Sequence, residues 1–230
     1  MRTVQWLTLF LALISAAPAG AGVLEVSLLD QHGKPVADAV VTLLPQNKPS
    51  PSRGGLGGDG VDAPSPAHAT TVKVIDQKNL TFIPYIEIFR PGDSVVFRNS
   101  DGTRHHVYSF SPAKAFEFVL APGESSAPLV LDKTGVIAVG CNIHDQMIAY
   151  LYVSGAPWIA HSGANGTVKF RDLPAGAYTV RVWQPRLRPS QPDLAQSVTV
   201  VGATPVQTVK FDLPLLPDPR LQFDREHTSY

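Results

Sequence analysis

The chain has 230 residues with 19 basic and 19 acidic side chains, which gives a formal net charge of zero. Nothing in this balance points to binding of nucleic acid or of an anionic membrane surface. Hydrophobic residues make up 44% of the sequence, and the length suits either one large β domain or two small ones.

The N-terminus has the three parts of a secretory signal peptide. Arg2 is followed by an apolar run over residues 4–14, and small residues then lead to the motif Ala19-Gly20-Ala21. This run is shorter than the roughly 20 apolar residues that a membrane-spanning helix needs. We therefore expect residues 1–21 to be removed after Ala21 and the mature protein to be exported without a membrane anchor.

Short strand patterns follow one another along the rest of the chain. They are rich in Val, Ile, Tyr and Phe and are separated by Gly, Pro, Asp and Asn. We predict strands at residues 23–30, 39–44, 70–76, 85–89, 94–99, 105–110, 135–140, 148–153, 166–170, 177–183 and 196–201. No segment keeps a helical period over three turns, and 21 prolines and 18 glycines suit many tight turns. The sequence therefore predicts an all-β sandwich protein.

One long segment has a different composition. Residues 45–70 are dense in Pro, Gly and Ser and contain few large apolar residues, which predicts a linker or a long loop.

The segments 22–44 and 155–213 look like two halves of one small domain. The first holds the turn pattern D-x-x-G-x-P between two strands, and the second holds the stretch LPAGAYTVRVW. These motifs resemble the carboxypeptidase-regulatory-like, transthyretin-like β-sandwich. The resemblance implies a sandwich interrupted by residues 71–154 and followed by a tail over 214–230; two unrelated sandwiches in series are the alternative. Within the second segment, Asn165-Gly166 predicts a β-hairpin.

Cys141 is the only cysteine of the chain. In an exported protein, a single cysteine is a buried inert thiol, half of an intermolecular disulfide, or a metal thiolate. His144 and Met147 lie close to it in the stretch GCNIHDQM. Each residue alone fits a packing or surface role, but together, directly after a predicted strand, they favour a metal site.

The segment 71–154 resembles a cupredoxin, the Greek-key β-sandwich of plastocyanin and amicyanin. A histidine, His105, follows Asn99 by six residues, and Cys141, His144 and Met147 have the compact C-x2-H-x2-M spacing. The other matching positions are Pro84, Gly92, Val95, Phe97 and Asn99. The resemblance implies one mononuclear type 1 copper ion, held by His105, Cys141, His144 and Met147. The residue types agree, because two imidazoles, one thiolate and a weak thioether make a blue-copper site.

Two adjacent histidines compete for the first ligand position. Neighbouring side chains of a strand point to opposite faces, so His105 and His106 cannot both face one ion. The resemblance favours His105 as the ligand. His106 then takes the place of a residue that hydrogen-bonds the position after the cysteine, so we expect a bond from His106 to Asn142 that braces the loop.

The chain as a whole resembles bacterial methylamine utilization proteins, which carry strings like HHVYSFSPAK at residues 105–114 and GCNIHD at residues 140–145. This resemblance implies a periplasmic protein that passes single electrons between redox partners, here an unidentified dehydrogenase or cytochrome. The alternative is a non-enzymatic module for copper binding, copper delivery or structural interaction.

Enzyme motifs are not found in the sequence. A multicopper oxidase needs paired H-x-H motifs, and the chain has none; it also lacks G-x-S-x-G and H-E-x-x-H. We therefore expect a protein without catalytic residues. The remaining histidines, His32, His68, His161 and His227, have no partner at ligand spacing, so we expect them at turns, loops and other surface positions.

Overall fold

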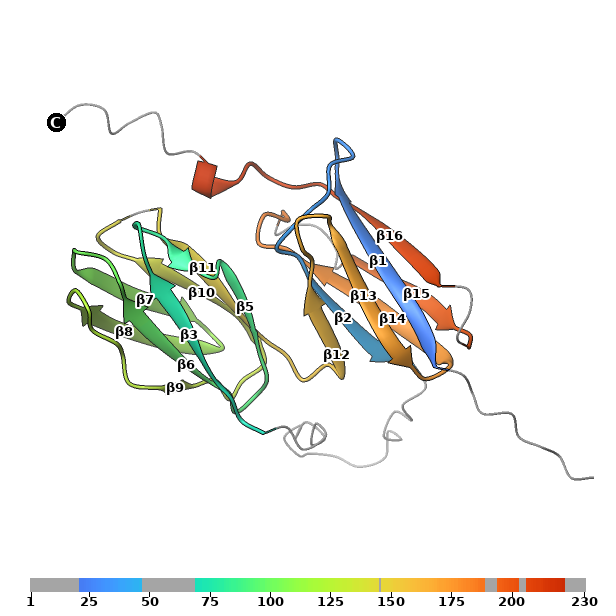
Figure 1. The fold of residues 1–230 in the computed structure, drawn as a ribbon, viewed down its shortest axis with the longest axis horizontal. Coiled ribbons are helices and arrows are strands. Elements are labelled where there is room, and N and C mark those ends of the chain that lie inside the picture. The colour runs from blue at the N-terminus through green and yellow to red at the C-terminus, as the bar shows by residue number, and fades with distance from the viewer. Residues whose placement is uncertain (1–20, 47–68, 145, 189–193, 203–205, 222–230) are drawn as a thin grey trace, which may run out of the picture.

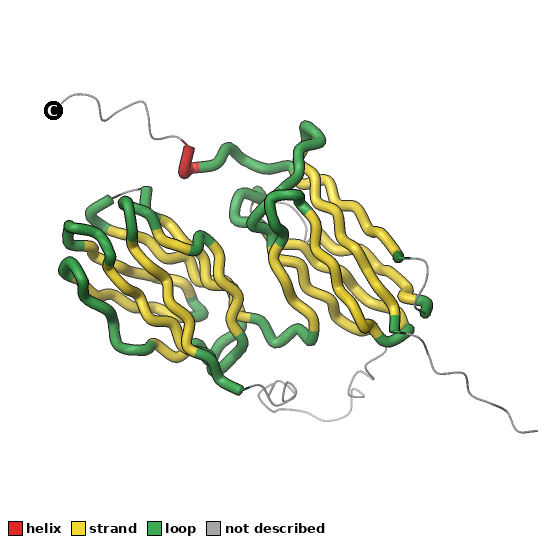
Figure 2. Tube along the Cα trace, in the orientation of Figure 1, coloured by secondary structure: helices red, strands yellow, loops and turns green. Residues whose placement is uncertain are grey.

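The computed structural model describes residues 21–46, 69–144, 146–188, 194–202 and 206–221. Within these residues the secondary structure consists of β-strands and one turn of 3-10 helix, η1 (Pro219–Leu221) (Figures 1 and 2). The all-β sandwich architecture predicted from the sequence is thereby confirmed. The expected signal peptide, apart from Ala21, and most of the expected linker lie outside the described residues.

The first group of strands, here called the central sandwich, has two sheets in the orders β4-β3-β6-β9 and β5-β11-β10-β7-β8. Its strands are β3 (Val72–Gln77), β4 (Phe82–Ile83), β5 (Ile86–Phe89), β6 (Ser94–Asn99), β7 (His105–Ser111), β8 (Lys114–Leu120), β9 (Leu129–Val130), β10 (Gly135–Cys141) and β11 (Ile148–Val153). Alternate side chains of these strands point inward. In β10, for example, Ile137, Val139 and Cys141 are buried in one core cluster.

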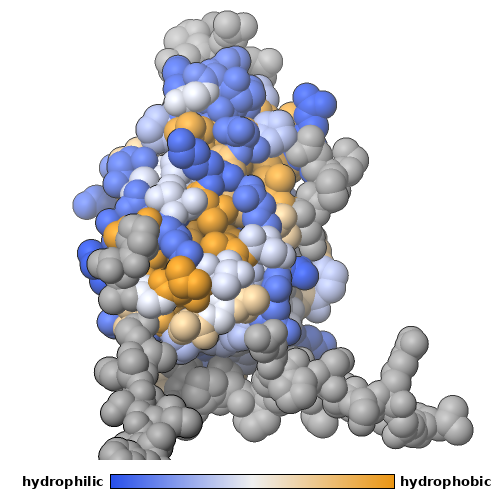
Figure 3. Space-filling view, turned by 90° about the vertical axis from the view of Figure 1, so that its right-hand side faces the viewer, coloured by the Kyte–Doolittle hydropathy of each residue, from blue (hydrophilic) through white to orange (hydrophobic). Residues whose placement is uncertain are grey.

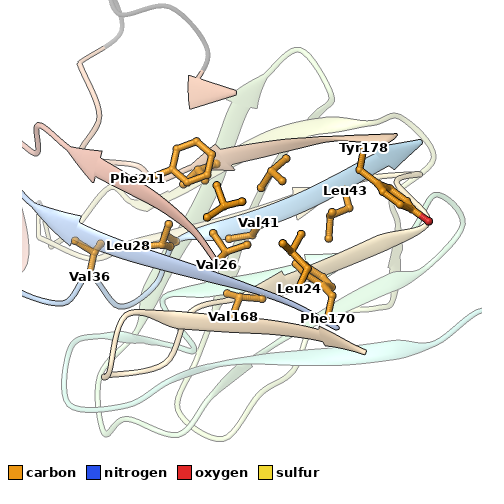
Figure 4. Close-up of a cluster of buried hydrophobic side chains, with 14 of the residues drawn as sticks. Leu24, Val26, Leu28, Val36, Val41, Leu43, Val168, Phe170, Tyr178 and Phe211 are labelled. Carbon is orange, nitrogen blue, oxygen red and sulfur yellow. The ribbon is translucent and has the colours of Figure 1, made fainter. Parts of the chain in front are cut away.

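The second group, here called the flanking sandwich, has sheets in the orders β13-β1-β16 and β12-β2-β14-β15. Its strands are β1 (Gly22–Asp30), β2 (Val40–Pro45), β12 (Trp158–His161), β13 (Thr167–Leu173), β14 (Gly176–Trp183), β15 (Leu194–Val200) and β16 (Gln207–Leu213). Figure 4 shows Leu24, Val26 and Leu28 of β1 pointing toward Val41 and Leu43 of β2, so the two sheets share one apolar core.

The flanking sandwich is built from both ends of the described chain. Strands β2 and β12 are antiparallel neighbours, with Trp158 paired to Leu43, although the whole central sandwich lies between them in the sequence. Figure 1 shows the central strands in teal, green and yellow beside a group that mixes blue and orange strands. The residue boundaries of the expected domains stay predictions.

The prediction of a β-hairpin at Asn165-Gly166 is wrong. The turn joins β12 to β13, and these strands belong to different sheets. Gly166 adopts a φ of 66° and its carbonyl accepts a hydrogen bond from the N–H of Leu28 at 2.8 Å. A Cβ at this position would lie 2.6 Å from the Leu28 carbonyl oxygen, so the glycine permits a close approach to β1.

The two sandwiches touch through a third apolar cluster. Tyr150 and Tyr152, on the outward face of β11, pack against Trp183 of β14 with ring centroids 5.6 and 5.2 Å apart. Part of the expected tail joins this contact. The guanidinium of Arg220 lies 3.7 Å from the ring centroid of Tyr85 in the central sandwich and 3.4 Å from a carboxylate oxygen of Asp38 in the flanking one.

The face of the flanking sandwich that points away from the central one shows apolar residues between polar ones (Figure 3). Within the described part of the chain, no helix is long and apolar enough to cross a membrane.

Candidate metal centre

Cys141 is the last residue of strand β10, and its position is set by the pairing of β10 with β7. Its Cα is paired with that of Val107 on β7, and its side chain is 3% exposed. The loop that follows returns sharply, because the N–H of Cys141 donates to the carbonyl of Met147 at 3.2 Å and the N–H of Met147 donates to the carbonyl of His144 at 3.0 Å. These two backbone bonds bring His144 back beside the cysteine.

The strand register separates the two adjacent histidines. His105 begins β7 with its side chain inward and fully buried, whereas the side chain of His106 points outward and is 22% exposed. His105 shares the inward face with Val107, which lies opposite Cys141. The structure therefore brings His105, and not His106, to the cysteine.

Three candidate ligand atoms converge between β7 and the loop after β10. The sulfur of Cys141 lies 3.7 Å from Nδ1 of His105 and 3.7 Å from Nδ1 of His144. The three side chains form a group whose ligand atoms all lie within 4.8 Å of one another, and whose chemistry suits a metal ion.

The spacing of these atoms fits a single metal ion. Metal–sulfur and metal–nitrogen bonds of about 2.3 and 2.0–2.1 Å, as for zinc, meeting at tetrahedral to trigonal angles put sulfur and nitrogen about 3.5–3.8 Å apart. The two observed distances of 3.7 Å fall in this interval. The residues present can therefore hold an ion without a change in the fold, and imidazole with thiolate is a donor set that copper and zinc both accept.

Met147 is buried in the core that contains Cys141. Its side chain is 1% exposed and belongs to the same buried cluster as Cys141. An axial role for its thioether stays a prediction.

The imidazole of His105 has a second polar partner on its far side. Its Nε2 lies 2.9 Å from Oδ2 of Asp101. Burial alone would raise the pKa of Asp101, but the N–H groups of Leu80 and Asn79 together with His105 outweigh it and lower that pKa. Asp101 is therefore an ionised acceptor at neutral pH.

His144 lies at the rim of the site and is partly exposed. Partial burial, and then the neighbouring imidazole of His105, lower its pKa, while Asp101 opposes them. The lowered pKa favours the neutral imidazole, which is the form that binds a metal ion.

His106 has two side-chain contacts on the outer face. Its Nδ1 lies 3.5 Å from Nδ2 of Asn142, the contact expected from the sequence, and its Nε2 lies 2.7 Å from Oε1 of Glu117. A 3.5 Å separation is at the limit for a hydrogen bond. The shorter bond between the strands runs from the N–H of Asn142 to the carbonyl of His106 at 3.0 Å, so the backbone holds the start of the loop.

The two other histidines in the described part of the chain do not join the site. His32 lies in the turn after β1, and His161 is exposed at the end of strand β12, where a loop was expected. His68 and His227 lie outside the described residues.

Two polar neighbours of the histidines were not predicted, Asp101 and Glu117. Asp101 stands in the stretch NSDGT, where Asp-Gly indicates a turn. Glu117 alternates with phenylalanines on β8, a strand that was not predicted.

Comparisons with known proteins give a partial likeness to copper proteins. No protein-family model and no curated protein matches the chain. A variant of amicyanin in the Cu(I) state is 16% identical over 35% of this chain and 80% of its own, with a TM-score of 0.33; another, also Cu(I), is 18% identical over 38% and 86%, with 0.34. A copper-containing nitrite reductase from Thermus scotoductus is 20% identical over 41% of this chain and 24% of its own, with 0.34. At these identities and TM-scores the likenesses assign no function to the chain.

Proposed function

We propose that this protein is an exported electron carrier with one type 1 copper ion, held by His105, Cys141, His144 and Met147. The observation that supports this most directly is the convergence of one sulfur and two imidazole nitrogens at 3.7 Å in a buried site. Copper accepts this mixed set of soft and nitrogen donors in both of its common oxidation states. When bound, copper supplies reversible one-electron chemistry.

The protein's own residues would keep the donors in place. His105 is fixed by strand β7 and Cys141 by strand β10, and the backbone bonds of the following loop fix His144 and Met147. Donors held in this way cannot rearrange freely, so the donor geometry would stay nearly the same when the charge of the ion changes. Burial of His105 and Cys141 keeps solvent away from these two donors.

Electron exchange would then take place at the exposed rim of the site. His144 and Ile143 lie there, and Ile143 is 52% exposed. An apolar side chain beside a partly exposed imidazole offers a partner protein a contact that is easily desolvated. We propose redox proteins, such as a dehydrogenase or a cytochrome, as partners and the periplasm as the location.

Copper delivery is the second candidate function. It would use the same donors but would need an exposed, exchangeable site. The burial of His105 at 0% and of Cys141 at 3% favours retention of the ion over transfer.

Film voltammetry and a chelator competition separate the two functions. A carrier gives a reversible one-electron wave and releases copper slowly to a strong chelator. Rapid release of copper to the chelator, without a reversible wave, would support delivery instead.

A further inference from the structure

We propose that Asp101 is a positioning residue of the metal site, which sets the tautomer of His105 and so aims its Nδ1 at Cys141. This inference rests on the proposed function for the kind of ion, but its geometry is read from the chain alone. The contact is close and shielded, because Oδ2 of Asp101 lies 2.9 Å from Nε2 of His105 and the two side chains are 11% and 0% exposed.

The chemistry of the pair selects one tautomer. Both oxygens of Asp101 already accept from backbone N–H groups, so the carboxylate faces the ring as an acceptor, and His105 must carry its proton on Nε2 to bond with it. The neutral ring then has its lone pair on Nδ1, the atom that lies 3.7 Å from the sulfur of Cys141. A metal-bound histidine needs this free lone pair, and a carboxylate on the other ring nitrogen makes it a stronger donor.

Asp101 is itself held by the backbone on both sides. Its Oδ1 accepts from the N–H of Asn79 at 2.5 Å and its Oδ2 accepts from the N–H of Leu80 at 3.0 Å. Its own N–H donates to Oδ1 of Asn99 at 2.9 Å, and Asn99 is fully buried. The carboxylate therefore receives three donors and cannot turn away without breaking several bonds.

The turn that supplies two of these donors has an unusual backbone. Asn79 and Leu80 both have a φ of 54°, in the left-handed region. Asparagine adopts this region more readily than most residues, whereas leucine rarely does. The strained turn directs two successive N–H groups at Asp101, so the carboxylate and the turn stabilise each other. We infer that the turn between β3 and β4 forms part of the support of the metal site.

The neighbouring histidine provides a matched control. His106 also meets a carboxylate, with Nε2 2.7 Å from Oε1 of Glu117, but that carboxylate side chain is 59% exposed. Asp101→Asn and Glu117→Gln make the same chemical change beside adjacent histidines. An amide has one acceptor oxygen where the carboxylate has two, so Asp101→Asn leaves an NH2 group facing at least one of the three donors and gives His105 a weaker acceptor, whereas Glu117→Gln leaves the surroundings of His105 unchanged.

The test reads the tautomer of His105 by ¹⁵N-correlated NMR in the metal-free full-length protein. We expect the wild type to carry the proton on Nε2, with slow exchange of that proton with water. Asp101→Asn should give a mixture of tautomers and lower the affinities for Zn²⁺ and Cu²⁺ by about 10- to 100-fold, whereas Glu117→Gln should leave both readouts as in the wild type.

Two results would overturn the proposal that Asp101 sets the tautomer of His105. A wild-type His105 that carries its proton on Nδ1 overturns the proposal, even if the Asp101 variant fails to fold. So does a folded Asp101→Asn protein with the wild-type tautomer and Zn²⁺ affinity. Because the NMR measurement needs no metal, a failure of the copper proposal would leave this result standing by itself.

Discussion

Cys141 has no possible substitute in this chain, because the sequence contains no other cysteine. Its thiol is buried among the side chains of the central core, so its replacement removes the sulfur donor and leaves the strand pairs in place. We expect Cys141→Ser to lose the intense visible absorption of a copper–thiolate bond. The variant should also lower the free energy of unfolding by about 1 kcal/mol. Absorption spectroscopy and urea unfolding measure the two effects. A variant that keeps the colour would exclude Cys141 as the ligand.

Met147 is predicted to give a weak axial thioether. Leucine has nearly the same volume, so Met147→Leu should preserve the packing of a residue that is 1% exposed. Loss of a weak donor should keep the copper and its colour but raise the reduction potential. Voltammetry of the two proteins checks this expectation. If the variant binds no copper at all, Met147 has a different role.

At the scale of single residues, the sequence could propose candidate donors but not what surrounds them. The spacing of Cys141, His144 and Met147 in one short loop is a local signal. The choice between His105 and His106 depends on strand register, and their neighbours on both faces are partly apolar, so hydrophobicity could not decide it. Asp101 could not be predicted because its role depends on a turn at residues 79 and 80, which only the fold brings near.

At the level of single elements, variants of strand β7 test which of its two adjacent histidines is the ligand. His105 is fully buried toward Cys141, whereas His106 points outward. His105→Ala should weaken or shift the visible spectrum. Added imidazole should partly restore the spectrum by occupying the vacated ligand position. His106→Ala should keep the native spectrum and lose copper faster to a chelator, because one outer contact of the loop is gone. The reverse pattern would mean that the proposed ligand assignment is off by one residue.

The strands predicted from the sequence agree with the structure where hydrophobic runs are long and bounded by turns. Strands β6 and β11 have the predicted bounds. Strands β4 and β9 have two residues each, which is too short for a periodic signal. Strand β8 alternates Phe116 and Phe118 with exposed residues and was missed although this signal is present. The turn at Gly166 was misread because an Asn-Gly pair does not reveal which sheet the next strand joins.

For the whole molecule, the contact between the sandwiches should add stability without tuning the site. Trp183 packs on Tyr150 and Tyr152, which point away from the core that contains Cys141. We expect Trp183→Ala to lower the free energy of unfolding by about 1–3 kcal/mol, since the ring is only partly buried. The copper spectrum should stay unchanged. Urea unfolding and absorption spectra test this, and an altered spectrum would show that the flanking sandwich shapes the metal site.

The architecture of two sandwiches was predictable because their strand patterns and turn motifs are local. The contact between them was not, since it depends on aromatic side chains that the sequence alone assigns to no partner. The expected tail illustrates this limit. Arg220 has nothing in its local sequence that predicts its position over Tyr85.

We propose that one ion binds between Cys141, His105 and His144 as type 1 copper. The most direct measurement is the visible and paramagnetic resonance spectrum of the purified protein after addition of one equivalent of Cu(II). We predict an intense thiolate-to-copper absorption and a small copper hyperfine splitting, because the unpaired electron is shared with the sulfur of Cys141. A weakly coloured protein with a large hyperfine splitting, or one that takes up no copper, would rule out type 1 copper at this site.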